Sequence, residues 1–175
     1  GRLDEIGDEV RRCLERRRRL LNCPPDKLLV HPLSASKAGN TALRAWTTLL
    51  DSEPAAPAPP AAGDSVSMST HGFPDAGVRA PFGVKDVIDV AGFPTRAGSR
   101  ALEHAPICRQ DALAVSRLRA MGLVPIGKTV TTEYASFDPP VTRNPWNRAR
   151  TPGGSSSGSA AGVAAGMCPA ATGSE

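Results

Sequence analysis

The feature that most constrains the fold is a run of glycine and serine that leads into a helix of small residues. Gly153–Gly158 reads Gly-Gly-Ser-Ser-Ser-Gly, and the alanine-rich segment 160–167 that follows predicts a helix. Glycine recurs every four residues, at Gly158, Gly162 and Gly166, so one face of this helix carries no side chains. Because a helical glycine costs about 1 kcal/mol relative to alanine, we expect this face to pack closely against other backbone.

Apolar periodicity on either side of position 100 predicts further strands and helices. The spacing favours a strand over 83–90, a helix over 112–121 capped by Asp111 and stopped by Gly122, and a short buried strand over 123–126. A proline- and asparagine-rich loop follows over 139–150. This order of strand, helix, strand, loop and helix is typical of an α/β fold.

The chain divides at a proline–alanine stretch. Residues 54–63 predict an extended, exposed linker. They separate an N-terminal helical segment, 1–53, from the region 64–175. Within the first segment we expect an amphipathic helix over 3–21, a short strand over 28–30 and a short helix over 41–50.

Four consecutive arginines, at positions 16–19, lie near the end of the predicted N-terminal helix. They are consistent with a contact to an anionic surface or a nucleic acid, or with a solvated helix end paired to nearby acids such as Asp8. The second interpretation is favoured because no aromatic or further basic cluster accompanies them. Nucleic-acid binding is therefore not expected, and the net charge of +4 does not by itself imply it.

Several protein classes are disfavoured by composition. No apolar run approaches the roughly 18 residues of a membrane span, and the first residues lack the apolar stretch of a secretory signal. The four cysteines form no Cys-x-x-Cys pair, so neither a zinc site nor a disulfide framework is expected. We expect reduced thiols, a cytoplasmic location, no metal and no cofactor.

Two motif matches fail on their context. The segment Gly122–Thr129 fits the phosphate-loop pattern, but its variable positions look like a strand, Pro125 removes one N–H group, and Lys128 is expected to be exposed. The segment Gly154–Gly158 fits a nucleophile elbow centred on Ser156. That motif needs a preceding strand and a later histidine, and neither is present in this sequence.

Serine hydroxyls at a helix N-terminus suit acyl-transfer chemistry, provided that a base is available. Lys85 lies within a predicted apolar strand, and burial would lower the pKa of its ammonium group so that it could accept a proton. The simpler alternative is an exposed strand lysine paired with Asp86 or Asp89. Spacing alone favours that alternative.

Four ordered motifs occupy the stretch from Pro81 to Glu175, about 95 of the 175 residues. They read Pro-Phe-Gly-Val-Lys-Asp at 81–86, Gly-Lys-Thr at 127–129, Arg-Asn-Pro-Trp-Asn at 143–147, and Thr-Pro-Gly-Gly-Ser-Ser-Ser-Gly-Ser-Ala-Ala at 151–161. In this order and spacing they resemble the N-terminal part of the amidase signature family. The resemblance implies an α/β fold in which helices surround a mixed sheet.

The resemblance also implies a site. The family hydrolyses carboxylic amides with a Ser–cis-Ser–Lys triad, which makes Lys85 the base, Ser155 the bridging serine after a cis peptide, and Ser156 a supporting residue. The residues after the Gly-Lys-Thr strand line the family's pocket, which assigns substrate binding to Tyr134, Ala135, Ser136 and Phe137. A small-molecule amide would be the substrate, with no metal or cofactor.

The nucleophile of the family lies in a Thr-Gly-Gly-Ser segment that follows a Gly-Ser-Asp-like triplet. Here the sequence ends at Gly173-Ser174-Glu175, so the resemblance predicts a fragment that ends before the nucleophile and is inactive alone. Two alternatives stay open. One is a non-catalytic paralogue that acts as an interaction protein, and the other is the amidotransferase subunit that amidates charged tRNA.

Overall fold

We describe the chain from a computed structural model that covers residues 8, 11–12, 15, 18–19, 30–52 and 80–175. The described residues between 8 and 19 are helical and exposed, and the Arg11 guanidinium contacts the Asp8 carboxylate at 3.1 Å. The rest of the expected N-terminal helix and the linker 54–63 lie outside the described residues. The expected strand over 28–30 does too, apart from Val30, which begins a helix.

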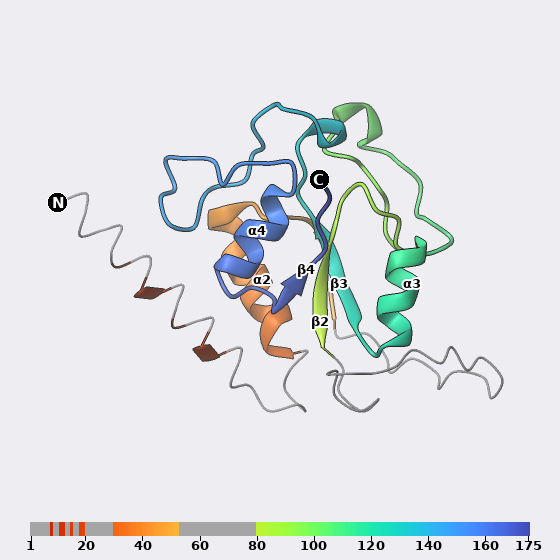
Figure 1. Cartoon of the computed structure of the whole chain (residues 1–175), viewed down its shortest axis with the longest axis horizontal. Helices are drawn as coiled ribbons and strands as arrows, with labels where there is room; N and C mark the ends of the chain where they lie inside the picture. The colour runs from red at the N-terminus through yellow and green to blue at the C-terminus, as the bar shows by residue number, and fades with distance from the viewer. Residues whose placement is uncertain (1–7, 9–10, 13–14, 16–17, 20–29, 53–79) are drawn as a thin grey trace.

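A four-stranded mixed sheet forms the centre of the described structure (Figure 1). Its strands are β1 (Trp46–Leu49), β2 (Pro81–Lys85), β3 (Val124–Thr129) and β4 (Ala170–Ala171), in the order β1-β3-β2-β4. The inner strands β3 and β2 are parallel to each other, β4 is parallel to β2, and β1 is antiparallel to β3. The α/β class and the mixed sheet predicted from sequence are confirmed.

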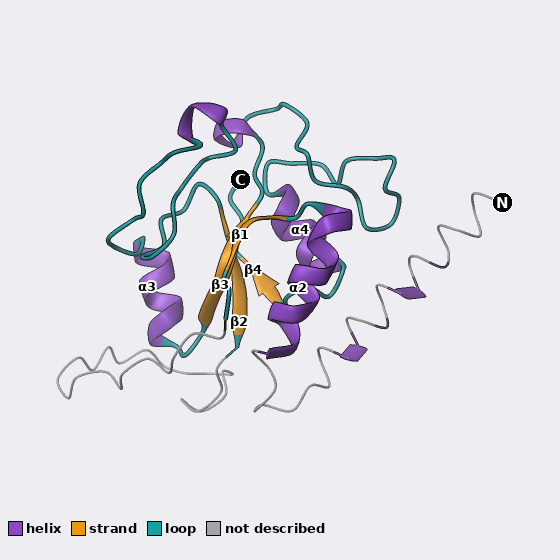
Figure 2. Ribbon diagram, turned by 180° about the vertical axis from the view of Figure 1, so that it is seen from behind, coloured by secondary structure: helices purple, strands orange, loops and turns teal. Residues whose placement is uncertain are grey.

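Helices cover both faces of this sheet (Figures 1 and 2). Two of them, α2 (Val30–Leu43) and α4 (Ser157–Ala164), lie on one side, and α3 (Leu113–Ala120) lies on the other. Each side has its own apolar core. The α2/α4 side buries Leu43, Ala45, Trp46, Ile126, Ala161, Ala165, Met167 and Cys168, and the α3 side buries Phe82, Val84, Val90, Phe93 and Val115.

Of the three glycines expected to form a closely packed helix face, only Gly158 lies against backbone. A Cβ at Gly158 would collide with the backbone of Ala45 and Val130, because the first turn of α4 rests on the end of β3. The Gly158 N–H donates to the Val130 carbonyl at 2.9 Å. Gly162 faces the Trp46 indole with room for a methyl group. Gly166 lies beyond the helix in a left-handed conformation, with φ of 66°.

Three local expectations are wrong. The expected helix over 41–50 is instead the end of α2 followed by strand β1, because Arg44 takes a φ of 51° and turns the chain onto β3. The strand expected over 83–90 ends at Lys85. Asp111 does not cap α3: its carboxylate accepts from the Ala91 N–H at 2.8 Å and pairs with Arg119 at 2.8 Å.

The described part of segment 1–53 packs onto the sheet. Strand β1 pairs with β3, and Leu43 and Trp46 contribute to the α2/α4 core. The Ser36 hydroxyl donates to the Met167 carbonyl at 2.8 Å, which ties α2 to the segment after α4. Residues 43–46 therefore share a core with residues of the region 80–175.

The close packing of the first turn of α4 predicts that alanine substitutions at its two glycines change the stability of the protein differently. Gly158→Ala should lower the free energy of unfolding by about 1–3 kcal/mol, because rigid backbone must move to admit the methyl group. Gly162→Ala should be neutral or raise it by up to about 1 kcal/mol, because the methyl group fits and helical glycine is unfavourable. Chemical unfolding of both variants measures the difference, and equal effects would contradict the described packing.

Candidate active site

Lys85 is the last residue of β2, and its side chain is fully buried. Side chains alternate along a strand. Phe82 and Val84 enter the core on the α3 side, so Gly83 and Lys85 face the α2/α4 side. The amine therefore lies at the carboxyl end of a parallel strand, beside the N-terminus of α4. Ligand sites of α/β sheets commonly lie just beyond such strand ends.

The Lys85 amine is held by hydroxyl groups. Its Nζ donates to Ser155 Oγ at 2.5 Å and to Ser174 Oγ at 2.7 Å, with a longer bond of 3.4 Å to the Ser174 carbonyl. An ammonium group has three donors and no acceptor, so these three contacts fill its bonding capacity. The structure thus brings together the two residues that the resemblance assigned to catalysis, Lys85 and Ser155.

Ser155 lies in the Gly/Ser run just before α4. The Gly154–Ser155 peptide bond is cis. The Ser155 carbonyl accepts from the Thr132 N–H at 3.1 Å, and a Cβ at Gly154 would lie 2.7 Å from the Thr132 methyl group. The segment after β3 therefore fixes the backbone that presents the Ser155 hydroxyl to the amine.

Ser156 contacts the backbone of Ser174 rather than Lys85. Its Oγ donates to the Ser174 carbonyl at 3.2 Å and accepts from the Ser174 N–H at 3.2 Å. This two-way bond holds the segment after β4 against the Gly/Ser run. Ser156 is thus placed to support the site indirectly, through Ser174, a member of the 173–175 triplet to which the sequence analysis assigned no role.

Further hydroxyls connect the site to the sheet. The Lys85 N–H donates to Thr172 Oγ1 at 3.1 Å, and Ser159 Oγ donates to the Thr172 carbonyl at 2.7 Å. Ser159 also shares a hydrogen bond of 2.7 Å with Thr129 on β3. The end of β2 is therefore tied to both α4 and β3 by neutral polar groups.

Burial sets the electrostatics of Lys85. Loss of water around the ammonium lowers its pKa from the ordinary lysine value, and the Glu175 carboxylate opposes this shift. A buried lysine bonded to hydroxyls can lose its proton and then accept one from a neighbouring hydroxyl. The arrangement can therefore move a proton between Ser155 and Lys85.

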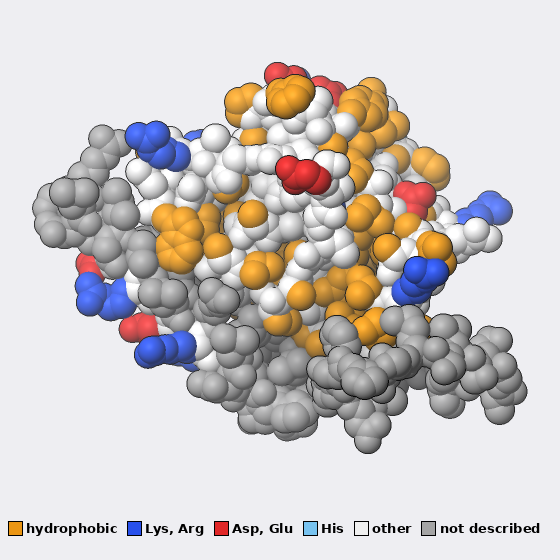
Figure 3. All heavy atoms as spheres, in the orientation of Figure 1, with side chains coloured by type: hydrophobic (Ala, Val, Ile, Leu, Met, Phe, Trp, Pro, Cys, Tyr) orange, Lys and Arg blue, Asp and Glu red, His pale blue; other side chains and the backbone are white. Residues whose placement is uncertain are grey.

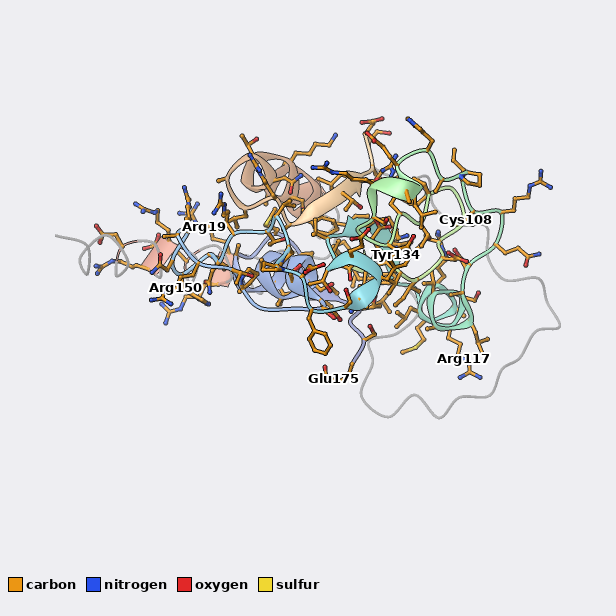
Figure 4. The ribbon with its side chains drawn as sticks, turned by 90° about the horizontal axis from the view of Figure 1, so that it is seen from above. Arg19, Cys108, Arg117, Tyr134, Arg150 and Glu175 are labelled. Atoms are coloured by element: carbon orange, nitrogen blue, oxygen red, sulfur yellow. The ribbon has the colours of Figure 1, made fainter. Side chains whose placement is uncertain are left out.

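The four residues expected to bind substrate form an exposed loop. Tyr134 and Ala135 lie in the short helix η3 (Glu133–Ala135) and take positive φ angles, and the Phe137 side chain is fully exposed. Ser136 turns back on the loop, with its Oγ donating to the Glu133 carbonyl at 2.6 Å. Figure 4 shows Tyr134 in the view down onto this end of the sheet.

This loop and the Ser155 backbone share one anchor. The Ala135 N–H donates to the Thr132 carbonyl at 3.0 Å, and the Thr132 N–H donates to the Ser155 carbonyl. Thr132 is therefore bonded both to the loop and to the backbone of Ser155, so the loop begins close to Ser155.

Lys128 is buried, which corrects the expectation that it is exposed. Its Nζ lies 2.9 Å from Asp86 Oδ1, and both side chains are inaccessible to solvent. This also excludes the alternative pairing of Lys85 with Asp86. The Asp86 carboxylate binds the lysine of the neighbouring strand, and Lys85 keeps its hydroxyl partners.

A shallow pocket of about 400 Å³ lies between α4 and the segment after β4. Ser156 and Gly173 line the end nearest Lys85, and the rest is mainly the apolar outer face of α4. Figure 3 shows mostly uncharged side chains over α4 and β4. This surface suits an uncharged group placed next to the hydroxyls.

Two features are absent from the described part of the chain. In ranges 30–52 and 80–175 and the few residues described before them, no three His, Cys, Asp or Glu side chains are grouped to hold a metal ion. Nor does any helix there have the length and apolar character to cross a membrane.

Comparison with known proteins supplies a family. The profile of the Amidase family matches residues 34–175, which extends the resemblance seen from Pro81 onward. A glutamyl-tRNA(Gln) amidotransferase subunit of Nitratidesulfovibrio vulgaris is 48% identical over 103 residues, covering 54% of this chain and 20% of that protein.

Two solved structures share the fold. A glutamyl-tRNA(Gln) amidotransferase subunit of Thermotoga maritima matches with a TM-score of 0.67 and 30% identity, covering 84% of this chain and 30% of that one. A native peptide amidase of Stenotrophomonas maltophilia matches with a TM-score of 0.61 and 27% identity, covering 90% and 34%. The chain therefore spans a fifth to a third of the length of these relatives.

The charge next to the amine gives a prediction for the pKa of Lys85. Glu175→Gln removes the carboxylate that raises this pKa, so the pKa should fall further below the ordinary lysine value. Lysine-selective NMR titration of the full-length protein measures it, with Glu103→Gln as an exposed control that should leave it unchanged. A Lys85 pKa that rises or stays constant in Glu175→Gln would contradict the described electrostatics.

Proposed function

The chain belongs to the amidase family, and on that premise we propose that it supplies the proton-transfer half of an amide-hydrolysing site. Lys85 is the general base, and Ser155 is the bridging residue between this base and the nucleophile. The observation that carries the proposal is the fully buried Lys85 amine, 2.5 Å from Ser155 Oγ. Burial keeps the amine from holding its proton as tightly as an exposed lysine does.

The proposed reaction has two halves. A nucleophilic serine, of the Thr-Gly-Gly-Ser kind that follows a Gly-Ser-Asp-like triplet in the family, gives its proton to Ser155 Oγ while Ser155 passes its own to Lys85 Nζ. The serine oxygen bonds to the amide carbonyl carbon. The C–N bond then breaks, and the leaving nitrogen takes a proton back through Ser155. Water repeats the sequence on the acyl-enzyme and releases the acid.

Ser156 and the hydroxyl network give this relay its geometry. Ser156 fixes Ser174 by the two-way bond, and Ser174 Oγ is the second acceptor for the Lys85 amine at 2.7 Å. A base with two fixed hydroxyl partners stays aligned while protons move, which is the positioning that efficient proton transfer requires. We therefore assign Ser156 a supporting role.

The substrate in this proposal is a small carboxylic amide. The loop 134–137 exposes the aromatic side chains of Tyr134 and Phe137, and we assign substrate contacts to it in this proposal. The pocket along α4 is mainly apolar and uncharged. Both features favour an uncharged substituent next to the scissile amide.

The second candidate is a subunit that generates ammonia for tRNA-dependent amidation. The observation in its favour is the 48% identity to an amidotransferase subunit over 103 residues. The two functions differ in substrate. Hydrolysis of a range of small amides by the isolated full-length protein supports the amidase, whereas glutamine hydrolysis that requires partner subunits and charged tRNA supports the amidotransferase.

The base assignment predicts a large loss of rate in two variants. In the full-length protein, Lys85→Ala and Ser155→Ala should each lower kcat for amide hydrolysis by about 10²- to 10⁴-fold, the usual contribution of acid–base catalysis. KM should change little, because neither group binds the ground-state substrate in this proposal. Steady-state kinetics on a chromogenic anilide measures both constants.

Lys37→Ala is the matched control. Lys37 is exposed, and its amine donates to the Asp51 carbonyl, away from the site. It should retain wild-type kcat. Wild-type turnover in Lys85→Ala would disprove the base assignment, and absence of hydrolysis in the unmodified protein on amides of every class would favour the non-catalytic alternative.

A further inference from the structure

The proposed reaction uses Lys85 but leaves unexplained a second buried lysine on the neighbouring strand. Lys128 and Asp86 form an ion pair at 2.9 Å with neither side chain exposed. Desolvation of two charges can cancel the attraction between them, so a buried pair is weak evidence for stability. Asp86 is joined to Lys85 by one peptide bond, which suggests a role in the site.

Asp86 is held by five polar contacts. Its carboxylate accepts from Thr47 Oγ1 on β1 at 3.2 Å and from the Arg96 N–H at 3.4 Å, in addition to Lys128. Its own N–H donates to the Thr129 carbonyl at 3.0 Å, and its carbonyl accepts from the Ala97 N–H at 2.8 Å. The residue directly after Lys85 is therefore fixed to β1, to β3 and to the loop that follows β2.

Lys128 also binds the loop that follows β2. Its Nζ donates to the Pro94 carbonyl at 3.2 Å and to Thr95 Oγ1 at 2.9 Å. Together with Asp86, these contacts fill its three donors. Lys128 is paired with Val84 in the register of β2 and β3, so it lies on the face of the sheet opposite the Lys85 amine.

We propose that Asp86 and Lys128 are positioning residues that fix the backbone of Lys85, so that its amine meets the hydroxyls of Ser155 and Ser174. The inference rests on the proposed function. Its physical basis is the shared peptide unit, because a shift of Asp86 must move Lys85. The hydrogen bonds from Lys85 Nζ to Ser155 Oγ and Ser174 Oγ, at 2.5 and 2.7 Å, would be lengthened by even a small shift of the Lys85 backbone.

The test replaces both charges by apolar groups of similar shape, Asp86→Leu with Lys128→Met, in the full-length protein. Replacing both members of a buried pair commonly preserves folding, whereas removing one does not. We expect kcat to fall by about 10²-fold with KM nearly unchanged, which is the cost of a misplacement of roughly 1 Å. The Lys85 pKa, followed by lysine-selective NMR, should rise toward the ordinary value as the loosened amine gains water.

The matched control is Asp111→Leu with Arg119→Met. This pair also joins an acid to a base, and Asp111 also accepts from a backbone N–H, that of Ala91, but it lies at α3 away from Lys85. The control should retain wild-type kcat and Lys85 pKa. A folded Asp86→Leu/Lys128→Met protein with wild-type kcat and an unchanged Lys85 pKa would overturn the proposal and leave the pair as a folding element only.

Two further arms keep the test decisive. If the double variant does not fold, Thr47→Val removes one bond to Asp86 while both charges stay paired, and it should lower kcat and raise the Lys85 pKa to a smaller extent; no change in either would overturn the proposal. If the unmodified protein hydrolyses no amide, the proposed function fails, and the NMR titration alone decides the positioning role.

Discussion

The structure depends on one unusual placement, a lysine amine buried at the carboxyl end of β2 with hydroxyls as its side-chain partners. A buried ammonium is costly unless it is paired with an acid or gives up its proton. Lys85 has no acid within hydrogen-bonding distance among the described residues; its nearest partners are Ser155 and Ser174. The surrounding elements support this placement, since α4 and the segments after β3 and after β4 each supply a hydroxyl or hold the backbone of one.

The two buried lysines show how partners decide roles. Lys85 and Lys128 occupy adjacent parallel strands, and both side chains are inaccessible to solvent. Lys128 binds the Asp86 carboxylate, a partner of opposite charge, at 2.9 Å. Lys85 faces the other side of the sheet and binds neutral oxygens, which is the arrangement that the proposed proton transfer requires. In this proposal, one sheet carries an ion-paired lysine on one face and the catalytic base on the other.

Local sequence signals predicted much of this arrangement. The small-residue helix, the buried apolar strands and the α/β class followed from spacing, and the family motifs assigned the roles of Lys85, Ser155 and Ser156. Lys85 and Ser155 are 70 residues apart in the sequence, so local spacing could not predict their contact, whereas the resemblance implied it. The assignments of substrate binding to 134–137 and of catalysis to Lys85 and Ser155 stay predictions until activity is measured.

Other features of the fold and the site could not be predicted from the sequence, because they depend on contacts between distant segments. Lys128 has no acid nearby in its own segment, so the sequence did not show which charge would accompany it on burial. Its partner, Asp86, lies just after β2. Trp46–Leu49 has a helix before it and polar threonines within it, and it becomes a strand because β3 offers an edge to pair with. Ser174 and Thr172 carry no sequence signal apart from the place of Ser174 in the 173–175 triplet and of Thr172 just before it. Tertiary pairing decided each of these cases.

The central claim is that Lys85 acts as the base in its neutral form. The most direct test compares two quantities in the full-length protein: the apparent pKa of the acid limb of kcat/KM for amide hydrolysis, and the pKa of the Lys85 amine from lysine-selective NMR. Rate should rise with pH as Lys85 loses its proton, so the account predicts that the two values coincide and lie below the ordinary lysine value of about 10.4. A rate that is already at its maximum at a pH where Lys85 is still fully protonated would contradict it.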